Sequence, residues 1–372
     1  MPKRLACVVG ARPNFMKIAP LIRTLNQESF RDKAKVTLIH TGQHYDANLS
    51  DVFFAELGMP APDVSLEVGS GSHAAQTARI LERMERVLLN GPPSGGTFDY
   101  VVVVGDVNST LAAAIAAAKL GVRIAHIEAG LRSFDRSMPE EINRLVTDSI
   151  ADLLFVSEPA GVENLICEGH PAESIKLVGN VMIDTLHHMS ARANKLAIAQ
   201  QLGLRPREYG VITMHRPSNV DSNSTLAALV DVLIDISDEI PFVFPVHPRT
   251  SNALDRAGLR QRMEKTANLW LMEPLGYLPF LSLTSQARVI VTDSGGLQEE
   301  STALGIPCLT LRSNTERPIT VDLGTSTLIG NDADKLRNAL RDVLSGQYKS
   351  GICPELWDGR AAERIASVLV VD

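Results

Sequence analysis

Acidic side chains follow two neighbouring predicted strands of this chain. Residues 101–104 are a run of valines and residues 122–127 form the next apolar run, as in strands buried on both faces of a parallel sheet. Asp106 follows the first run and Glu128 ends the second. Ligands bind at the carboxyl edge of open α/β sheets, so we expect both carboxylates to lie in one site.

A third acid, Glu140, follows Pro139 at the predicted start of a helix, where the positive end of the helix dipole stabilises a carboxylate. Taken singly, Asp106 is equally explained as a turn residue, and Asn108 or Ser109 can cap the alanine-rich helix between the two strands. Three acids together favour acid/base chemistry, because neighbouring carboxylates push one another's pKa values apart.

Two cations, Arg12 and Lys17, follow the first predicted strand and its turn, Gly10 to Pro13. The turn lacks the G-x-G-x-x-G pattern of dinucleotide-binding folds. The alternative interpretation is a pair of solvated surface cations. His44, in a polar loop, is a catalytic candidate with a surface histidine as its alternative.

The second half offers groups suited to a diphosphate. Ser294, Gly295 and Gly296 lie between a predicted buried strand and a helix, where free N–H groups and the helix dipole attract phosphate. The alternative is an ordinary strand-to-helix turn. One helical turn on, Glu300 can accept hydrogen bonds from ribose hydroxyls. His215 and Arg317 also follow strands and add local positive charge; all are substrate-binding candidates.

The whole chain alternates strands and helices, which predicts an α/β fold with doubly wound parallel sheets. We predict a first domain of residues 1–180 plus 360–372, with the C-terminal helix packing back, and a second domain of 181–359. The predicted strands lie at residues 4–9, 36–40, 101–104, 122–127, 153–156, 175–178, 209–213, 242–246, 269–272, 289–292 and 307–311.

Composition narrows the class of protein. The 372 residues exceed one typical core, and the net charge of −7 argues against a general nucleic-acid binder. No apolar run approaches the ~18 residues of a membrane span, so we expect a cytoplasmic protein without membrane contact. Cys7 and Cys308 are expected in the core, and no cysteine or histidine spacing suggests a metal site.

The chain resembles the non-hydrolysing UDP-N-acetylglucosamine 2-epimerases. The resemblance runs in order from residue 12 to 318 and rests on these motifs: Arg12-Pro-x-x-x-Lys17, Gly105-Asp106, His126-Ile-Glu128-Ala-Gly-Leu-Arg132, Pro139-Glu140-Glu141-x-Asn143-Arg144, His215-Arg216, Tyr277-Leu-Pro279-Phe280, Thr292-Asp-Ser294-Gly-Gly-x-Gln-Glu-Glu300 and Thr315-Glu316-Arg317-Pro318.

The resemblance implies a GT-B-like fold, in which two Rossmann-like domains face each other across a cleft, usually as a homodimer. It implies reversible conversion of UDP-GlcNAc to UDP-ManNAc, a precursor of surface polysaccharides, without a cofactor. By matched position the catalytic residues would be Arg12, Lys17, Asp106, Glu128, Glu140 and His215. By the same matching, the nucleotide would be held at uracil by Phe280, at the phosphates by Ser294, at the ribose by Glu300 and at the diphosphate by Arg317.

The chain departs from relatives in two places. Leu275-Gly276 stands where relatives often carry glutamine before the Tyr-Leu-Pro-Phe segment. Gln43-His44-Tyr45-Asp46 stands where some bacterial relatives use Gln-x-x-Gln to bind an activating second UDP-GlcNAc, so we do not expect activation in that form.

Four other functions stay open at this stage. They are a 2-epimerase of a UDP-diacetamido-uronic acid, a hydrolysing epimerase, a GT-B glycosyltransferase, and a nucleotide-sugar binding protein without chemistry.

Overall fold

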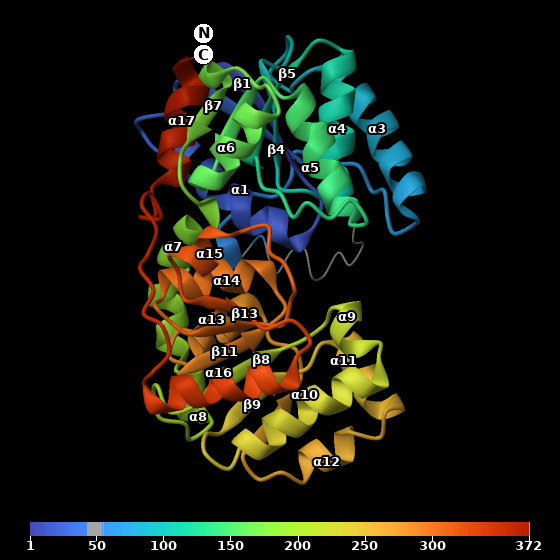
Figure 1. Ribbon diagram of the computed structural model, residues 1–372. Coiled ribbons are helices and arrows are strands. Elements are labelled where there is room, and N and C mark those ends of the chain that lie inside the picture. The colour runs from blue at the N-terminus through green and yellow to red at the C-terminus, as the bar shows by residue number, and fades with distance from the viewer. Residues whose placement is uncertain (43–53, 55, 372) are drawn as a thin grey trace. The chain divides into compact units, whose positions relative to one another are not determined.

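The computed structural model describes residues 1–42, 54 and 56–371. His44 and the Gln43–Asp46 segment lie outside these residues, as does the side chain of Arg12. The chain divides into two compact units: unit 1 comprises Met1–Leu186 with Glu355–Asp372, and unit 2 comprises His187–Pro354. Each unit is an α/β layer structure with its own sheet (Figure 1).

Unit 1 is built on a seven-stranded parallel sheet in the order β3-β2-β1-β4-β5-β6-β7. The order steps outward from β1 in both directions, as in a doubly wound fold. The strands are β1 (Lys3–Val9), β2 (Ala34–His40), β3 (Val64–Ser65), β4 (Tyr100–Val104), β5 (Arg123–Ala129), β6 (Leu153–Val156) and β7 (Ile175–Leu177).

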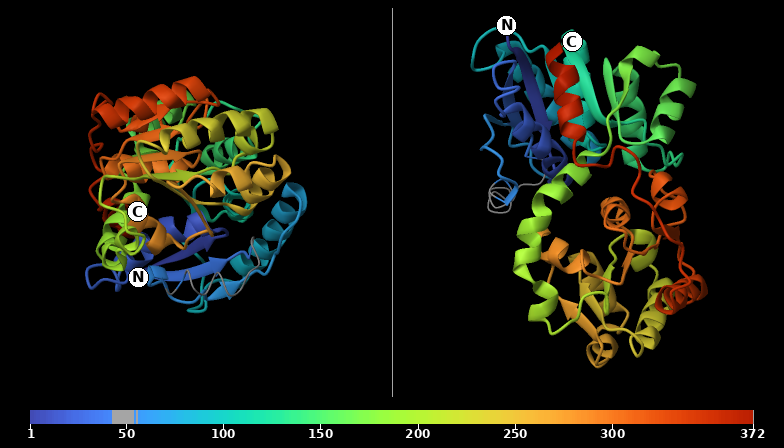
Figure 2. Two further views of the ribbon diagram at one scale, coloured as in Figure 1. Left: turned by 90° about the horizontal axis from the view of Figure 1, so that it is seen from below. Right: turned by 90° about the vertical axis from the view of Figure 1, so that its left-hand side faces the viewer.

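Helices cover this sheet. Helices α3, α4 and α5 lie side by side, and α17 packs on α1 and lies alongside the sheet (Figures 1 and 2). Alternate residues of β1, Ala6 and Val8, join the core beneath α3 and α4. The helices are α1 (Arg12–Leu25), α3 (His73–Asn90), α4 (Asn108–Lys119), α5 (Pro139–Ile150), α6 (Pro159–Cys167), η1 (Ala172–Ser174), α7 (Val181–Leu196) and α17 (Ala361–Val371).

Unit 2 has a six-stranded parallel sheet in the order β10-β9-β8-β11-β12-β13. Successive residues of one strand enter different cores: Val211 joins one cluster and Ile212 the other, so both faces of the sheet are covered. The strands are β8 (Gly210–Thr213), β9 (Phe242–Pro245), β10 (Leu269–Met272), β11 (Val289–Thr292), β12 (Cys308–Thr310) and β13 (Ser326–Leu328).

Two of the unit 2 helices, α10 and α16, pack together over the larger of these clusters. The helices are α8 (Ile198–Gln201), α9 (Pro217–Val220), α10 (Asn223–Ile236), α11 (Pro248–Arg256), α12 (Arg260–Glu264), α13 (Tyr277–Thr284), α14 (Gly295–Ala303), α15 (Ile319–Asp322) and α16 (Ala333–Ser345).

The division falls at 186/187 and 354/355, whereas we predicted 180/181 and 359/360. The reason is that the first turns of α7 bond to unit 1. Asp184 accepts hydrogen bonds from the backbone N–H groups of Ala361 (3.1 Å) and Ala362 (2.7 Å), the first two residues of α17. The hydroxyl of Thr185 donates to the carbonyl of Met16.

One local prediction was wrong. Asn108 does not cap α4: it is the first helical residue, Val107 occupies the N-cap position, and neither makes a side-chain cap. Instead the Asn108 amide donates to Gln76 Oε1 of α3 at 2.8 Å. Among the described residues, no helix is long and apolar enough to cross a membrane.

Candidate active site

In unit 1 an ion pair joins α1 to the end of β5. Lys17 on α1 pairs with Glu128, and both side chains are largely buried, with 10% and 3% exposed. The pair lies directly beside Gly105, since a Cβ added there would lie 3.2 Å from Lys17 Nζ and 3.5 Å from Glu128 Oε2. Asp106 follows Gly105, so the structure brings Lys17, Glu128 and Asp106 together.

The backbone around Glu128 is unusual. Glu128 has φ 68°, the left-handed region that disfavours side chains with a Cβ, and the pairing of β5 with β6 shifts register at this residue. Such a bulge re-aims a side chain, and strain of ~1–3 kcal/mol persists where surrounding structure enforces it. Strained residues of this kind cluster in active sites, which supports a functional role for Glu128.

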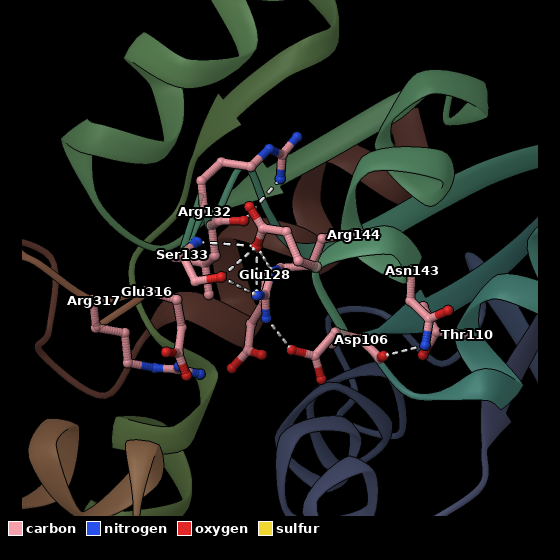
Figure 3. A network of polar contacts seen from close by, with 12 residues as sticks. Asp106, Thr110, Glu128, Arg132, Ser133, Asn143, Arg144, Glu316 and Arg317 are labelled. Atoms are coloured by element: carbon pink, nitrogen blue, oxygen red, sulfur yellow. Dashed lines mark hydrogen bonds and ion pairs between the residues drawn. The ribbon is translucent and has the colours of Figure 1, made fainter. Parts of the chain in front are cut away.

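Asp106 is held by α5. Arg144 pairs with Asp106 through one guanidinium nitrogen and with Glu141 Oε2 through another, at 2.6 Å (Figure 3). The amide of Asn143 donates to the carbonyl oxygen of Asp106 at 2.7 Å. These contacts fix both the backbone and the carboxylate of Asp106, which stays partly exposed.

The two adjacent glutamates of α5 differ in environment. Glu141 is buried and accepts hydrogen bonds from the backbone N–H groups of Ser133 (3.0 Å) and Phe134 (2.9 Å). Burial favours the neutral acid, but these bonds and the charge of Arg144 outweigh it, so the pKa of Glu141 is lowered. Glu140 is exposed in the first turn of the helix. Glu141 is therefore a fixed anion, and Glu140 is the member of the pair that faces solvent.

A buried chain of polar contacts runs from His126 to Arg132. His126 of β5 bonds through Nε2 to the carbonyl of Gly105 (2.8 Å) and through Nδ1 to Asp148 (2.6 Å). The other oxygen of Asp148 accepts from Gly130 N (3.0 Å) and pairs with Arg132 (2.7 Å). His126 and Asp148 therefore tie together the strand ends that carry Asp106 and Glu128.

Unit 2 contains a histidine–aspartate pair at the ends of β8 and β11. His215 Nδ1 lies 2.7 Å from Asp293 Oδ1, and the backbone N–H of His215 donates to the other oxygen at 2.8 Å. Burial alone would raise the pKa of Asp293, but its bonds to His215 lower it. Because Asp293 fixes Nδ1 of the half-exposed His215 ring, Nε2 is the nitrogen left to meet a ligand.

At the start of α14, side chains from the segment after β12 lie close to the helix backbone. Its N-cap, Ser294, makes no side-chain cap, and the first N–H groups of any helix lack intrahelical partners. A Cβ on Gly295 would lie 2.9 Å from Glu316 Oε1 and 3.3 Å from Arg317 Nη1, so a side chain there would displace these groups. Arg317 also pairs with Glu299 Oε1 at 2.6 Å. Arg317 thus lies beside the predicted phosphate loop Ser294-Gly295-Gly296.

Glu300 contacts α13, the helix that also carries Phe280. The hydroxyl of Tyr277 donates to Glu300 Oε1 at 3.0 Å, and Phe280 lies one turn further along α13, half buried against the smaller core of unit 2. All unit 2 residues predicted from the sequence therefore lie on elements that follow β8, β10, β11 and β12 at the carboxyl edge of one sheet.

The functional interpretation of the sequence did not include the groups that hold these residues. Arg144 and Asn143 fix Asp106, Asp293 fixes His215, and Glu316 contacts Arg317. These residues all lie inside the motifs that carry the family resemblance, and that position was the sequence signal that could have identified them. Across the described ranges 1–42, 54 and 56–371, no three histidine, cysteine or acidic side chains are grouped as a metal site would require.

The chain has two parallel-sheet α/β units. One unit carries acids at its strand ends, and the other carries a glycine-rich helix start beside an arginine. Together with the similar solved structures, these features define the chain as a GT-B-like enzyme. The family model described as UDP-N-acetylglucosamine 2-epimerase matches residues 27–370. The chain belongs to the UDP-N-acetylglucosamine 2-epimerase family.

Individual relatives span nearly the whole chain. The UDP-N-acetylglucosamine 2-epimerase of Methanococcus maripaludis is 42% identical over 92% of each chain. The UDP-2,3-diacetamido-2,3-dideoxy-D-glucuronate 2-epimerase of Pseudomonas aeruginosa is 37% identical over 98% of this chain and 99% of its own. The crystal structure of the Methanocaldococcus jannaschii UDP-GlcNAc 2-epimerase with UDP-GlcNAc and UDP matches with TM-score 0.85 and 38% identity, over 99% of this chain and 100% of that one.

Proposed function

We propose that this chain interconverts UDP-GlcNAc and UDP-ManNAc by inverting sugar C2, without hydrolysing the nucleotide sugar. One observation carries the proposal: in this member of the family, Asp106 follows Gly105, Glu128 lies beside Gly105, and Lys17 pairs with Glu128. Paired carboxylates in different environments suit proton removal and delivery at one carbon.

The chemistry requires elimination because the proton on C2 is not adjacent to a carbonyl and is weakly acidic. The C1–O bond breaks and its electron pair leaves with UDP, while a carboxylate takes the C2 proton, leaving 2-acetamidoglucal. Protonation of C2 from the opposite face and return of UDP to C1 give the epimer. Asp106, Glu128 and Glu140 form the proposed acid/base set, and inversion requires proton delivery from the second face.

Unit 2 binds the nucleotide in this proposal. Phe280 contacts uracil, Glu300 accepts from the ribose hydroxyls, and the backbone of Ser294, Gly295 and Gly296 binds the phosphates. Arg317 donates to the diphosphate as it departs, and Nε2 of His215 contacts it. Removing one such preorganised donor costs on the order of 10²–10³ in rate. Lys17 and Arg12 of the first unit are the further cations that the family resemblance implies.

The Pseudomonas aeruginosa relative supports a second candidate, a 2-epimerase of a UDP-diacetamido-uronic acid, at 37% identity. The two candidates share the chemistry at C2 and differ in the substituents at C3 and C6. The ratio of kcat/KM for the two nucleotide sugars distinguishes them.

The test is incubation with UDP-GlcNAc alone, followed by NMR. Formation of UDP-ManNAc with no free sugar supports the proposal. Release of free ManNAc and UDP indicates a hydrolysing epimerase, and an unchanged substrate that turns over only with an acceptor indicates a glycosyltransferase. Binding without any turnover indicates a non-catalytic nucleotide-sugar binding protein. The control is Glu128→Gln, which should bind UDP but lose turnover.

We further propose that the enzyme works in the cytoplasm as a homodimer, as the family resemblance implies. Analytical ultracentrifugation at micromolar concentration tests the assembly, since a single species of 40.3 kDa would refute a dimer. Cell fractionation tests the location.

A further inference from the structure

Arg312, which follows β12, is a buried arginine with unused hydrogen-bonding capacity. Its side chain is 3% exposed and its Nη2 donates to Glu316 Oε2 at 2.6 Å. Within the described part of the chain, its Nε and Nη1 groups are buried and have no hydrogen-bond partner. Leaving a buried charged donor unpaired is costly, so such a group indicates a missing partner.

One unused donor of Arg312, Nη1, lies at the start of α14. A Cβ on Gly295 would lie 3.8 Å from Arg312 Nη1, beside the 3.3 Å approach of Arg317 Nη1. Two guanidinium groups from the segment after β12 therefore reach the first turn of α14. Guanidinium forks match phosphate oxygens in planar, paired geometry.

Glu316 lies between the two arginines. Its Oε2 accepts from Arg312 and its Oε1 accepts from Arg317 Nη1 at 2.7 Å. Burial opposes its ionisation, but the charges of Arg317 and Arg312 hold the pKa of Glu316 far below its usual range. Glu316 is therefore an anion that bridges both guanidinium groups.

We propose that Arg312 is a second guanidinium donor to the diphosphate of the nucleotide sugar, and that Glu316 is the positioning residue that orients it. This inference rests on the proposed function, because it assigns Arg312 to the same substrate. Arg312 donates through Nη1, while Nη2 stays on Glu316. The interaction strengthens as the C1–O bond breaks and charge gathers on the departing phosphate.

The test compares the affinities of UDP and uridine by calorimetry, because their difference isolates the diphosphate. Arg312→Lys keeps a positive charge beside Glu316 but loses the fork. It should weaken UDP binding by roughly ten- to a hundred-fold, the value of a charge-assisted hydrogen bond, and leave uridine binding unchanged. The matched control is Arg262→Gln, because Arg262 pairs with Asp231 on the exposed surface of the same unit and should change neither affinity.

Unchanged UDP affinity in Arg312→Lys would overturn the inference. An equal loss of UDP and uridine affinity would also overturn it, because the effect would then not belong to the diphosphate. A double-mutant cycle with Glu316→Gln tests positioning: the UDP-specific effect of Arg312→Lys should shrink in that background, and additive effects would refute the role of Glu316.

These outcomes separate the inference from the proposed function. A wild-type chain that binds UDP but does not convert UDP-GlcNAc would refute the proposed activity, while the affinity series would still decide the role of Arg312.

Discussion

The contribution of the buried Lys17–Glu128 ion pair to stability can be measured separately from its contribution to catalysis. Replacing one partner, in Lys17→Met or Glu128→Gln, leaves the other buried charge without its counter-ion. With only 10% and 3% of these side chains exposed, each single change should lower the free energy of unfolding by about 3–5 kcal/mol. At roughly 2–4 °C per kcal/mol for a domain of this size, Tm should fall by about 6–20 °C.

The double variant Lys17→Met with Glu128→Gln should recover most of this stability, because no buried charge then lacks a partner. Activity should behave differently. All three variants should lose at least ~10²-fold in kcat, since none retains a charged base with its cation. Recovery of stability without recovery of turnover is the expected pattern, measured by calorimetry and by the epimerase assay on the same preparations.

Two results would refute this reasoning. A double variant whose loss of stability equals the sum of the two single losses would show that the pair is not coupled. A double variant with near wild-type turnover would remove both residues from the chemistry. Arg86→Gln is the matched control, because Arg86 forms an exposed pair with Glu82 and should change stability by less than ~1 kcal/mol.

Three further predictions concern other sites. Asp293→Asn should lower kcat by at least ~10-fold with little change in uridine affinity, since His215 loses its orienting carboxylate; unchanged kcat would contradict this. Although burial favours the neutral acid, neighbouring charges lower the pKa of Asp148. The contribution of Asp148 to the stability of the fold is therefore complete above about pH 4 and lost as pH falls through the lowered pKa. Asp148→Asn should flatten the acid side of a profile of unfolding free energy against pH. An unaltered slope would contradict this prediction. A thiol reagent should label the two exposed cysteines first, because burial raises the pKa of Cys7 to about 12 and also raises that of Cys308; rapid labelling of four thiols in native protein would disprove this.

Much of the fold could be predicted because the strands are long apolar runs separated by glycine-rich turns. All the predicted strands are present, shifted by no more than one or two residues at their ends. The missed strands are β3 (Val64–Ser65) and β13 (Ser326–Leu328), each at a sheet edge. Two or three residues carry no readable alternation, and only pairing with an existing edge defines such strands.

The site could be predicted in outline only. The place of Asp106 and Glu128 follows from the rule that parallel strands end at one edge, and the structure brings them together. The counter-charge on Asp106 could not be predicted, because Arg144 reaches it from a helix beyond the next strand. Asn108 was misjudged as a cap because its amide bonds instead to Gln76 of α3, a contact that sequence spacing does not encode.

The most direct measurement is an NMR time course of UDP-GlcNAc with the enzyme in D₂O. Elimination and return of UDP predict UDP-ManNAc that carries deuterium at C2, with deuterium also entering the recovered UDP-GlcNAc as the reaction reverses. UDP-ManNAc that keeps the original hydrogen at C2 would contradict the account.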